Sequence, residues 1–206
     1  MAGLDPAIHA MTAPPKPAEQ GLAMPVSANL TFRPVTEATR ADFEALFAAP
    51  GAPHHCWCMV WRRSSVEAKE NDPAGRKRQM MQRIAAGTPV GLLACDGATP
   101  IGWVSVAPRD THRNLGGPPA RPGEFIWSIV CFYVPRKRRG AGMVRRLIAA
   151  AVDHARDNGA TVVEAYPVPP DAPSYRFMGF IPVFTEAGFT DEGMAGVRRH
   201  VMRKRV

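Results

Sequence analysis

The chain has 206 residues, enough for one ordinary domain with a tail left over. Its hydrophobic fraction of 46% and charged fraction of 21% are typical of a globular protein with a buried core. The sequence holds no run near the roughly 18 consecutive apolar residues that a membrane-spanning helix needs. Because no basic cluster precedes an apolar run at the start, it also lacks a secretory pattern, and we expect a cytoplasmic protein.

The formal net charge of +8 predicts an attraction to anions, which leaves nucleic acid, an anionic membrane surface and a phosphate-rich cofactor open. Two basic clusters help to decide between them. The first suits a compact polyphosphate and consists of Arg136, Lys137, Arg138, Arg139, Arg145 and Arg146. We interpret the second as the solvated side of a terminal strand, with nucleic-acid contact as the alternative; it consists of Arg198, Arg199, Arg203, Lys204 and Arg205.

The four cysteines do not form a disulfide pattern. Cys95 and Cys131 lie in apolar runs, where a free cysteine behaves as a small buried hydrophobe. Cys56 and Cys58 flank Trp57, but no second Cys/His pair follows at ligand spacing, so we expect no metal site.

The first segment, residues 1–26, is rich in Pro and Ala and is predicted to be a disordered tail, because it cannot bury enough apolar area to offset its ordering entropy. The domain is predicted to span residues 27–206. It opens with a short strand over 30–33. A helix follows, for which Thr39 and Asp42 are placed as a capping box.

The segment 54–61 is irregular and rich in His, Cys and Trp. A second helix is predicted to start with Asp72 as N-cap and Pro73 as its first residue, and to end at Gly87. Strands are then expected over 90–95 and 101–106.

Asp96-Gly97 marks a hairpin turn between these two strands, with a loop that looks longer than two residues. The connection 108–123 is rich in Pro, Gly and Arg, and we place it close to a binding site. The run 125–134 is almost entirely apolar, which is typical of a central strand covered on both faces.

The clearest helix follows, with a stripe of apolar residues at helical spacing: Val144, Leu147, Ile148, Ala151, Val152 and Ala155. A strand is predicted over 161–165, a short helix over 181–187 and a terminal strand over 198–205, and a further short strand near Phe189 stays open. The order β-α-α-β-β-β-α-β-α-β predicts an α/β (α+β) fold in which helices cover both faces of a mixed sheet.

Arg139-Gly140-Ala141-Gly142 joins the central strand to this helix. Glycines let backbone N–H groups approach an anion closely, and a helix N-terminus adds unpaired donors and a positive dipole end. Strand, basic glycine turn and helix together predict a pyrophosphate site. The spacing fits neither the dinucleotide fingerprint nor the nucleoside-triphosphate loop.

This segment resembles the acetyl-CoA-binding motif of the GNAT superfamily, the GCN5-related N-acetyltransferases. Arg139, Gly142 and Val144 match the positions of the motif, and Leu147-Ile148 matches its apolar pair. The order of elements fits over 30–206, with the specific part in 125–166. The resemblance implies a mostly antiparallel central sheet and transfer of an acetyl group from acetyl-CoA to an amine, which we expect to be a small molecule.

The resemblance also implies site residues. Backbone groups of Phe132, Tyr133 and Val134 would pair with the pantetheine arm of the cofactor, beside Arg139. The pyrophosphate would be held by the N–H groups of Gly140, Ala141, Gly142, Met143 and Val144.

Three positions depart from the family pattern. Val144 stands where Gly or Ala is usual, and Pro135 comes one place early. Phe184 replaces the tyrosine that often protonates the departing thiolate, so Tyr166, Tyr175 or water is left for that role.

An amine must lose a proton before it attacks a thioester, and a carboxylate or a water chain usually accepts it. Glu164 is the first candidate base, and alternation along the strand puts it on the same face as Tyr166. Glu124 is the second candidate. A solvated carboxylate at a strand end is an equally good interpretation of each. Residues 54–61 either form an apolar wall for the acceptor or anchor their loop to the core.

Two other functions stay open: a catalytically silent acyl-CoA-binding or sensing module, and, less favoured, a nucleic-acid-binding protein. The expected partners are acetyl-CoA and a small amine, with no membrane and no metal, and a homodimer stays open.

Overall fold

The computed structural model describes residues 30–206, so the predicted tail over 1–26 and the start of the domain at residue 27 lie outside the described residues. The strands are β1 (Leu30–Pro34), β2 (Leu92–Asp96), β3 (Thr99–Pro108), β4 (Ile126–Tyr133), β5 (Val162–Ala165), β6 (Thr190–Ala195) and β7 (Arg199–Arg205). The α-helices are α1 (Arg40–Ala48), α2 (Pro73–Ala85), α3 (Met143–Asp157) and α4 (Ile181–Glu186). Within residues 30–206 no helix is both long and apolar enough to cross a membrane.

The strands form one seven-stranded sheet in the order β1-β2-β3-β4-β5-β7-β6. Only β4 and β5 pair in parallel, and every other neighbouring pair is antiparallel. The mixed, mostly antiparallel sheet flanked by helices is therefore confirmed, and the strand left open near Phe189 exists as β6.

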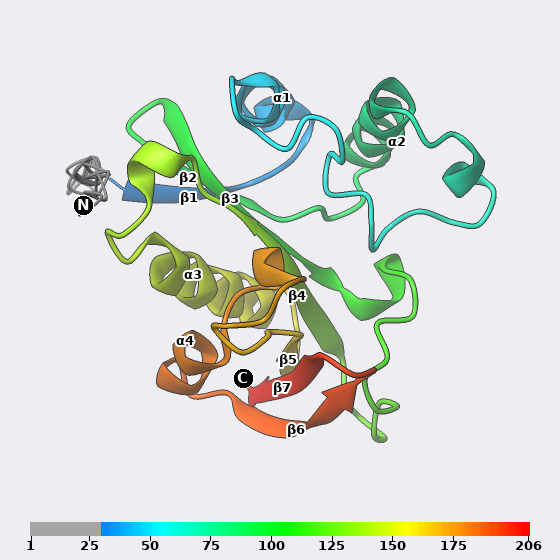
Figure 1. The fold of residues 1–206 in the computed structure, drawn as a ribbon, viewed down its shortest axis with the longest axis vertical. Coiled ribbons are helices and arrows are strands. Elements are labelled where there is room, and N and C mark those ends of the chain that lie inside the picture. Colours follow the sequence, from blue (N-terminus) through cyan, green and yellow to red (C-terminus); the bar gives the residue numbers. More distant parts are fainter. Residues whose placement is uncertain (1–29) are drawn as a thin grey trace, which may run out of the picture.

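Helices cover both faces of this sheet (Figure 1). The residues of α1 and α2 join one buried cluster with Trp103, Cys131 and Tyr133. The apolar stripe of α3 joins a second cluster on the opposite face, together with Phe184 of α4. Because side chains alternate along a strand, β4 contributes to both cores. The two faces of β4 are called the α1/α2 face and the α3/α4 face below.

The N-terminus of α2 is as predicted, because Asp72 accepts a hydrogen bond from the Gly75 N–H at 2.8 Å. The capping box predicted for α1 is wrong. Thr39 instead pairs with Thr36 around a short 3-10 turn, and Asp42 forms an ion pair of 2.7 Å with Arg33. The Thr39 hydroxyl accepts from the Thr36 N–H at 2.9 Å and donates to the Pro34 carbonyl at 2.7 Å, so it does not cap α1.

The hairpin between β2 and β3 is tighter than predicted. Asp96 pairs directly with Thr99, so the loop contains only Gly97 and Ala98. Gly97 has φ +58°, the left-handed conformation that such two-residue turns require and that glycine adopts without strain.

A bulge in β4 prepares the site. Ser105 pairs with Cys131 and the next residue of β3, Val106, pairs with Ile129, so Val130 is the extra residue. Ile129 is also the last residue of β4 that pairs with β5, opposite Ala165. Beyond this point β3 is the only strand of the described residues that pairs with β4, whose other edge faces the region that β5 has left.

Candidate active site

The turn before α3 presents main-chain donors in a row. Gly140 and Gly142 have φ of +83° and +72°, and Gly142 is the N-cap of α3. Within the described residues, the N–H groups from Gly140 to Val144 have no hydrogen-bond partner, and the first donor to bond back is that of Arg146, to the Gly142 carbonyl at 3.3 Å. Free amides at a helix start form a positive surface suited to an anion.

The basic side chains around this turn are only partly neutralised. Arg138 lies 3.5 Å from Asp96, and Arg145 lies 2.7 Å from Glu186. Within residues 30–206, four cationic groups form no ion pair: Arg136, Lys137, Arg139 and Arg146. Arg139 donates instead from Nε to the Val134 carbonyl at 3.0 Å, which ties the turn to the end of β4.

The three residues expected along the pantetheine arm face different cores. Phe132 and Val134 lie on the α3/α4 face. Tyr133 lies on the α1/α2 face with its ring centroid 5.5 Å from that of Phe47, and burial raises the pKa of its hydroxyl. Their main-chain groups, which carry the predicted role, run past the divergence of β4 from β5.

The position of the missing tyrosine is part of the core. Phe184 is fully buried, with ring centroids 5.2 Å from Phe189 and 6.1 Å from Phe132. A phenyl ring has no ionisable group, so Phe184 cannot protonate a leaving thiolate.

Glu164 lies at the centre of a buried hydrogen-bond network on the α1/α2 face. Its Oε1 accepts from the Ser128 hydroxyl at 2.9 Å and from the Tyr166 hydroxyl at 2.6 Å, and lies 3.2 Å from Nε of Arg109. Its Oε2 accepts from Nη2 of Arg203 at 3.1 Å. The predicted shared face of Glu164 and Tyr166 is thus a direct contact. Glu164 is fully buried, so the solvated interpretation does not apply to it.

Tyr166 comes directly after the last residue of β5 and therefore marks the divergence from β4. Burial, together with the neighbouring Glu164 carboxylate, raises the pKa of its hydroxyl, so this group stays protonated. Gly117 covers the hydroxyl closely, since a Cβ at position 117 would lie 2.5 Å from the oxygen. The connection after β3 is also tied to the network, because the Pro118 carbonyl accepts from Arg109 at 2.7 Å and from Arg203 at 3.0 Å.

Sequence reasoning missed Ser128, Arg109 and Arg203 as members of this network. The interpretation of the C-terminal basic cluster as solvated is wrong for Arg203, which is 4% exposed, and for the half-buried Arg199. The sequence contained a signal for this burial. Arg199 and Arg203 each stand two residues from the apolar Val201, which places all three on one face of β7.

The second candidate base lies elsewhere. Glu124 precedes β4, at the end opposite to the divergence, and lies 3.6 Å from both Arg203 and Arg205. A hydrogen bond from the Arg121 main chain, helped by these cations, lowers the pKa of the Glu124 carboxyl. Because Glu124 lies at the opposite end of β4 from the divergence, it is not placed to accept a proton there.

In the Cys-Trp-Cys segment, residues 54–61, different residues fit the two interpretations, which are an anchored loop and an apolar wall for the acceptor. Trp57 is buried and stacks on Phe47 at 5.6 Å, and Cys58 Sγ lies 3.2 Å from Cys131 Sγ, so this part anchors the loop. Trp61 lies farther along, over the guanidinium of Arg199. Within the described part of the chain, no group of three or more His, Cys, Asp or Glu side chains could hold a metal ion.

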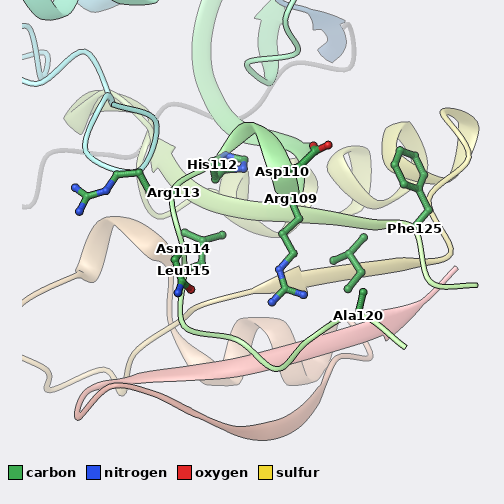
Figure 2. A pocket seen from close by; sticks show the side chains of 9 residues that line it. Arg109, Asp110, His112, Arg113, Asn114, Leu115, Ala120 and Phe125 are labelled. Carbon is green, nitrogen blue, oxygen red and sulfur yellow. The ribbon is translucent and has the colours of Figure 1, made fainter. Parts of the chain in front are cut away.

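A cavity of about 390 Å³ lies beside the network, between the connection after β3 and the start of β4 (Figure 2). Arg109 and Leu115 line it, and Phe125 stands at one side. His112 also lines it, and burial next to Arg62 holds the pKa of its ring well below the usual range. Arg109 belongs to both the cavity and the Glu164 network.

Comparison with known families assigns the chain to one of them. Residues 43–180 match the family model described as Acetyltransferase (GNAT) family, which is more than half of the chain. The chain belongs to the GNAT acetyltransferase family. The predicted resemblance is thereby confirmed, and this GNAT chain carries the glycine turn and the divergence of β4 from β5 within the matched range.

Solved structures support the GNAT fold. An uncharacterized protein from Bacillus halodurans has a TM-score of 0.56 and 14% identity, over 85% of this chain and 83% of that chain. The ribosomal-protein-S5-alanine acetyltransferase from Vibrio fischeri has a TM-score of 0.52 and 15% identity, over 87% and 94%. PH1933 from Pyrococcus horikoshii has a TM-score of 0.52 and 14% identity, over 86% and 98%. No curated protein matches the chain in sequence.

Proposed function

We propose that this GNAT protein is an acetyl-CoA-dependent N-acetyltransferase that acts on a small amine. The observation that carries the proposal is the row of five main-chain N–H groups from Gly140 to Val144, which have no partner among residues 30–206, beside four cationic side chains that form no ion pair in the same range. A diphosphate supplies several acceptors and negative charges at this spacing. Arg139, bonded to the end of β4, would place it in line with that strand.

The remainder of the cofactor would run along β4. Among residues 30–206 no strand pairs with β4 past Ile129 at the edge that β5 leaves, so an extended pantetheine arm would pair with main-chain groups of Phe132, Tyr133 and Val134. An extended ligand adds to such an edge as another strand would. The thioester would then reach the divergence near Tyr166, and backbone N–H groups at the bulge would polarise its carbonyl.

Glu164 and Tyr166 are the proposed catalytic pair. The Tyr166 hydroxyl, bonded to Glu164 at 2.6 Å, would accept a proton from the amine side while passing its own to the carboxylate. The raised pKa of the Tyr166 hydroxyl suits this relay, because it disfavours a lasting phenolate. Arg109 and Arg203 hold the carboxylate in place. With Phe184 in the core, water is left to protonate the departing thiolate.

A catalytically silent acyl-CoA-binding module is the second candidate. It is favoured by Phe184, which offers no proton, and by the burial of Tyr166 under Gly117. Such a module would bind the cofactor through the same turn and release no thiol.

Two measurements test the proposal in sequence. Calorimetric titration with acetyl-CoA and with CoA is expected to show one site per chain, and absence of binding to the folded protein would remove both candidates. Chromatographic detection of acetylated products with a panel of small amines is then expected to show turnover. Binding without any product would leave the silent module.

We also propose a cytoplasmic location. All four cysteines are free thiols, including Cys58 and Cys131 whose sulfur atoms lie 3.2 Å apart. Unbridged pairs of this kind are typical of a reducing compartment.

A further inference from the structure

Three aromatic rings surround the guanidinium of Arg199 on β7. Its Cζ lies 4.5 Å from the ring centroid of Trp61, 5.5 Å from that of Tyr175 and 5.6 Å from that of Tyr166. The rings come from three separate segments, and Tyr175 is held in the left-handed conformation at φ +60°, which is uncommon for a residue with a side chain. The three rings thus hold the cation in place through contacts that use none of its N–H groups as hydrogen-bond donors.

The hydrogen bonds of Arg199 are incomplete. One nitrogen, Nη1, donates to the Leu115 carbonyl at 3.0 Å, and within residues 30–206 no carboxylate lies within ion-pair distance of the group. Arg109 and Arg203 differ from Arg199 in this respect, because both form an ion pair with Glu164. Burial lowers the pKa of Arg199, as expected for a charge that has lost water without gaining an anion.

The guanidinium of Arg199 lies where an acceptor substrate would bind. Tyr166, one of the three rings around Arg199, is the first residue after the β4/β5 pairing ends. Arg199 therefore lies at the divergence on the α1/α2 face. Arg199 shares this face with Glu164 and Tyr166, so an acceptor that reaches the proposed catalytic pair would lie beside Arg199. Leu115, which holds Nη1, also lines the neighbouring cavity, where the body of an acceptor has room.

We infer that Arg199 is the carboxylate-binding residue of the acceptor site, so that the amine substrate is an amino acid or a similar small amino carboxylate. The inference rests on the proposed function. A planar guanidinium stacked on aromatic rings can present two parallel N–H groups to a carboxylate, which is the geometry that arginine supplies and lysine does not.

The test compares amino acids with the amides that lack their charge: glycine with glycinamide, leucine with leucinamide and phenylalanine with phenylalaninamide. The expected kcat/KM is about 10- to 100-fold higher for the acid of the preferred pair, the range of a charge-assisted hydrogen bond. Arg199→Met is expected to abolish this preference by lowering kcat/KM for the acid much more than for the amide, and Arg199→Lys is expected to restore the preference only in part. The loss is expected in KM more than in kcat.

Arg198→Met is the matched control, since Arg198 is an exposed neighbour that bonds to the Ser174 hydroxyl at 3.0 Å. It is expected to keep the acid preference. Equal rates for acid and amide in the unmodified protein, or a preference that survives Arg199→Met, would overturn the inference and leave the acetyltransferase proposal intact. In that case Arg199 merely ties β7 to the Leu115 segment.

If the protein turns over none of these amines, a binding measurement tests the inference instead. Calorimetry with N-acetylglycine, N-acetylleucine and N-acetylphenylalanine against their amides is made on the CoA-loaded protein, or on the free protein if CoA does not bind. Tighter binding of an acid that depends on Arg199 supports the carboxylate site even if the enzyme proposal has failed. No acid-specific binding would overturn it.

Discussion

The two faces of β4 reach the divergence with different kinds of chemistry. On the side of the glycine turn the donors are main-chain N–H groups, from Gly140 to Val144, with cations around them. On the α1/α2 face they are side chains from distant segments, gathered around one fully buried carboxylate, Glu164. A main-chain site tolerates changes of side chain as long as its backbone conformation persists, whereas a buried side-chain network fails when one member is lost. The cofactor side should therefore be generic and the acceptor side particular to this chain.

The largest expected effect is on the glycine turn. Gly142→Asp would add bulk and a negative charge where φ is +72° and where the diphosphate is proposed to lie. We expect CoA affinity to fall at least about 100-fold, equivalent to about 2.7 kcal/mol, as measured by calorimetry. Gly159→Asp is the control, because Gly159 has φ +84° and equally open space at the other end of α3. Unchanged affinity in a folded Gly142→Asp protein would refute the placement of the cofactor.

The next effect is on the network. Glu164→Gln would remove the nearest carboxylate of the buried Arg203 and of the partly buried Arg109, which is expected to lower the free energy of unfolding by about 3 kcal/mol. Denaturant unfolding measures this. In the protein that stays folded, turnover is expected to fall while CoA affinity is spared, in contrast to Gly142→Asp.

Glu124→Gln provides the comparison, because it removes another partner of Arg203 at the far end of β4. It is expected to change turnover little. If Glu164→Gln turned over its amine as fast as the unmodified protein, Glu164 would be a structural ion-pair partner and the relay through Tyr166 would be wrong.

The smallest effect concerns the Cys-Trp-Cys segment and leaves CoA binding unchanged. The pKa of the Cys56 thiol is lowered to about 6, first by a hydrogen bond from the Cys58 thiol, with help from the Cys58 N–H. Above this pH the thiolate predominates, so alkylation by iodoacetamide should rise through a midpoint near pH 6 and level off at neutral pH.

Cys56 is the half-buried thiol of the four, and the other three are buried. Mass spectrometry of the native protein at pH 7 should therefore find the label at Cys56, and Cys56→Ser should remove it. A midpoint near pH 9, the ordinary thiol value, would show that the contact with Cys58 does not form in solution.

The same contrast explains how much could be predicted from the sequence. The order of elements, the Asp72 cap and the glycine turn depend on local pattern, and these were predicted correctly. The pairing of Glu164 with Tyr166 followed from alternation within one strand. The partners Arg109, Ser128 and Arg203 come from three other strands or their ends, and no local pattern links residues that far apart. The capping box failed for a similar reason, because Asp42 is claimed by Arg33 of β1.

The single parallel junction has a consequence for folding. Four residue pairs join β4 to β5, and within the part of the chain that the structure describes they are the only strand pairing between the β1–β4 half of the sheet and the β5–β7–β6 half. Residues 126–129 and 162–165 must meet across the whole of α3, a long loop to close for few hydrogen bonds. A ligand that lies across this junction would bind only when the two halves are joined. At a concentration of 100 times its Kd it would stabilise the joined state by about 2.7 kcal/mol. Amide hydrogen exchange in β5 should therefore slow more than exchange in β2 when such a ligand binds.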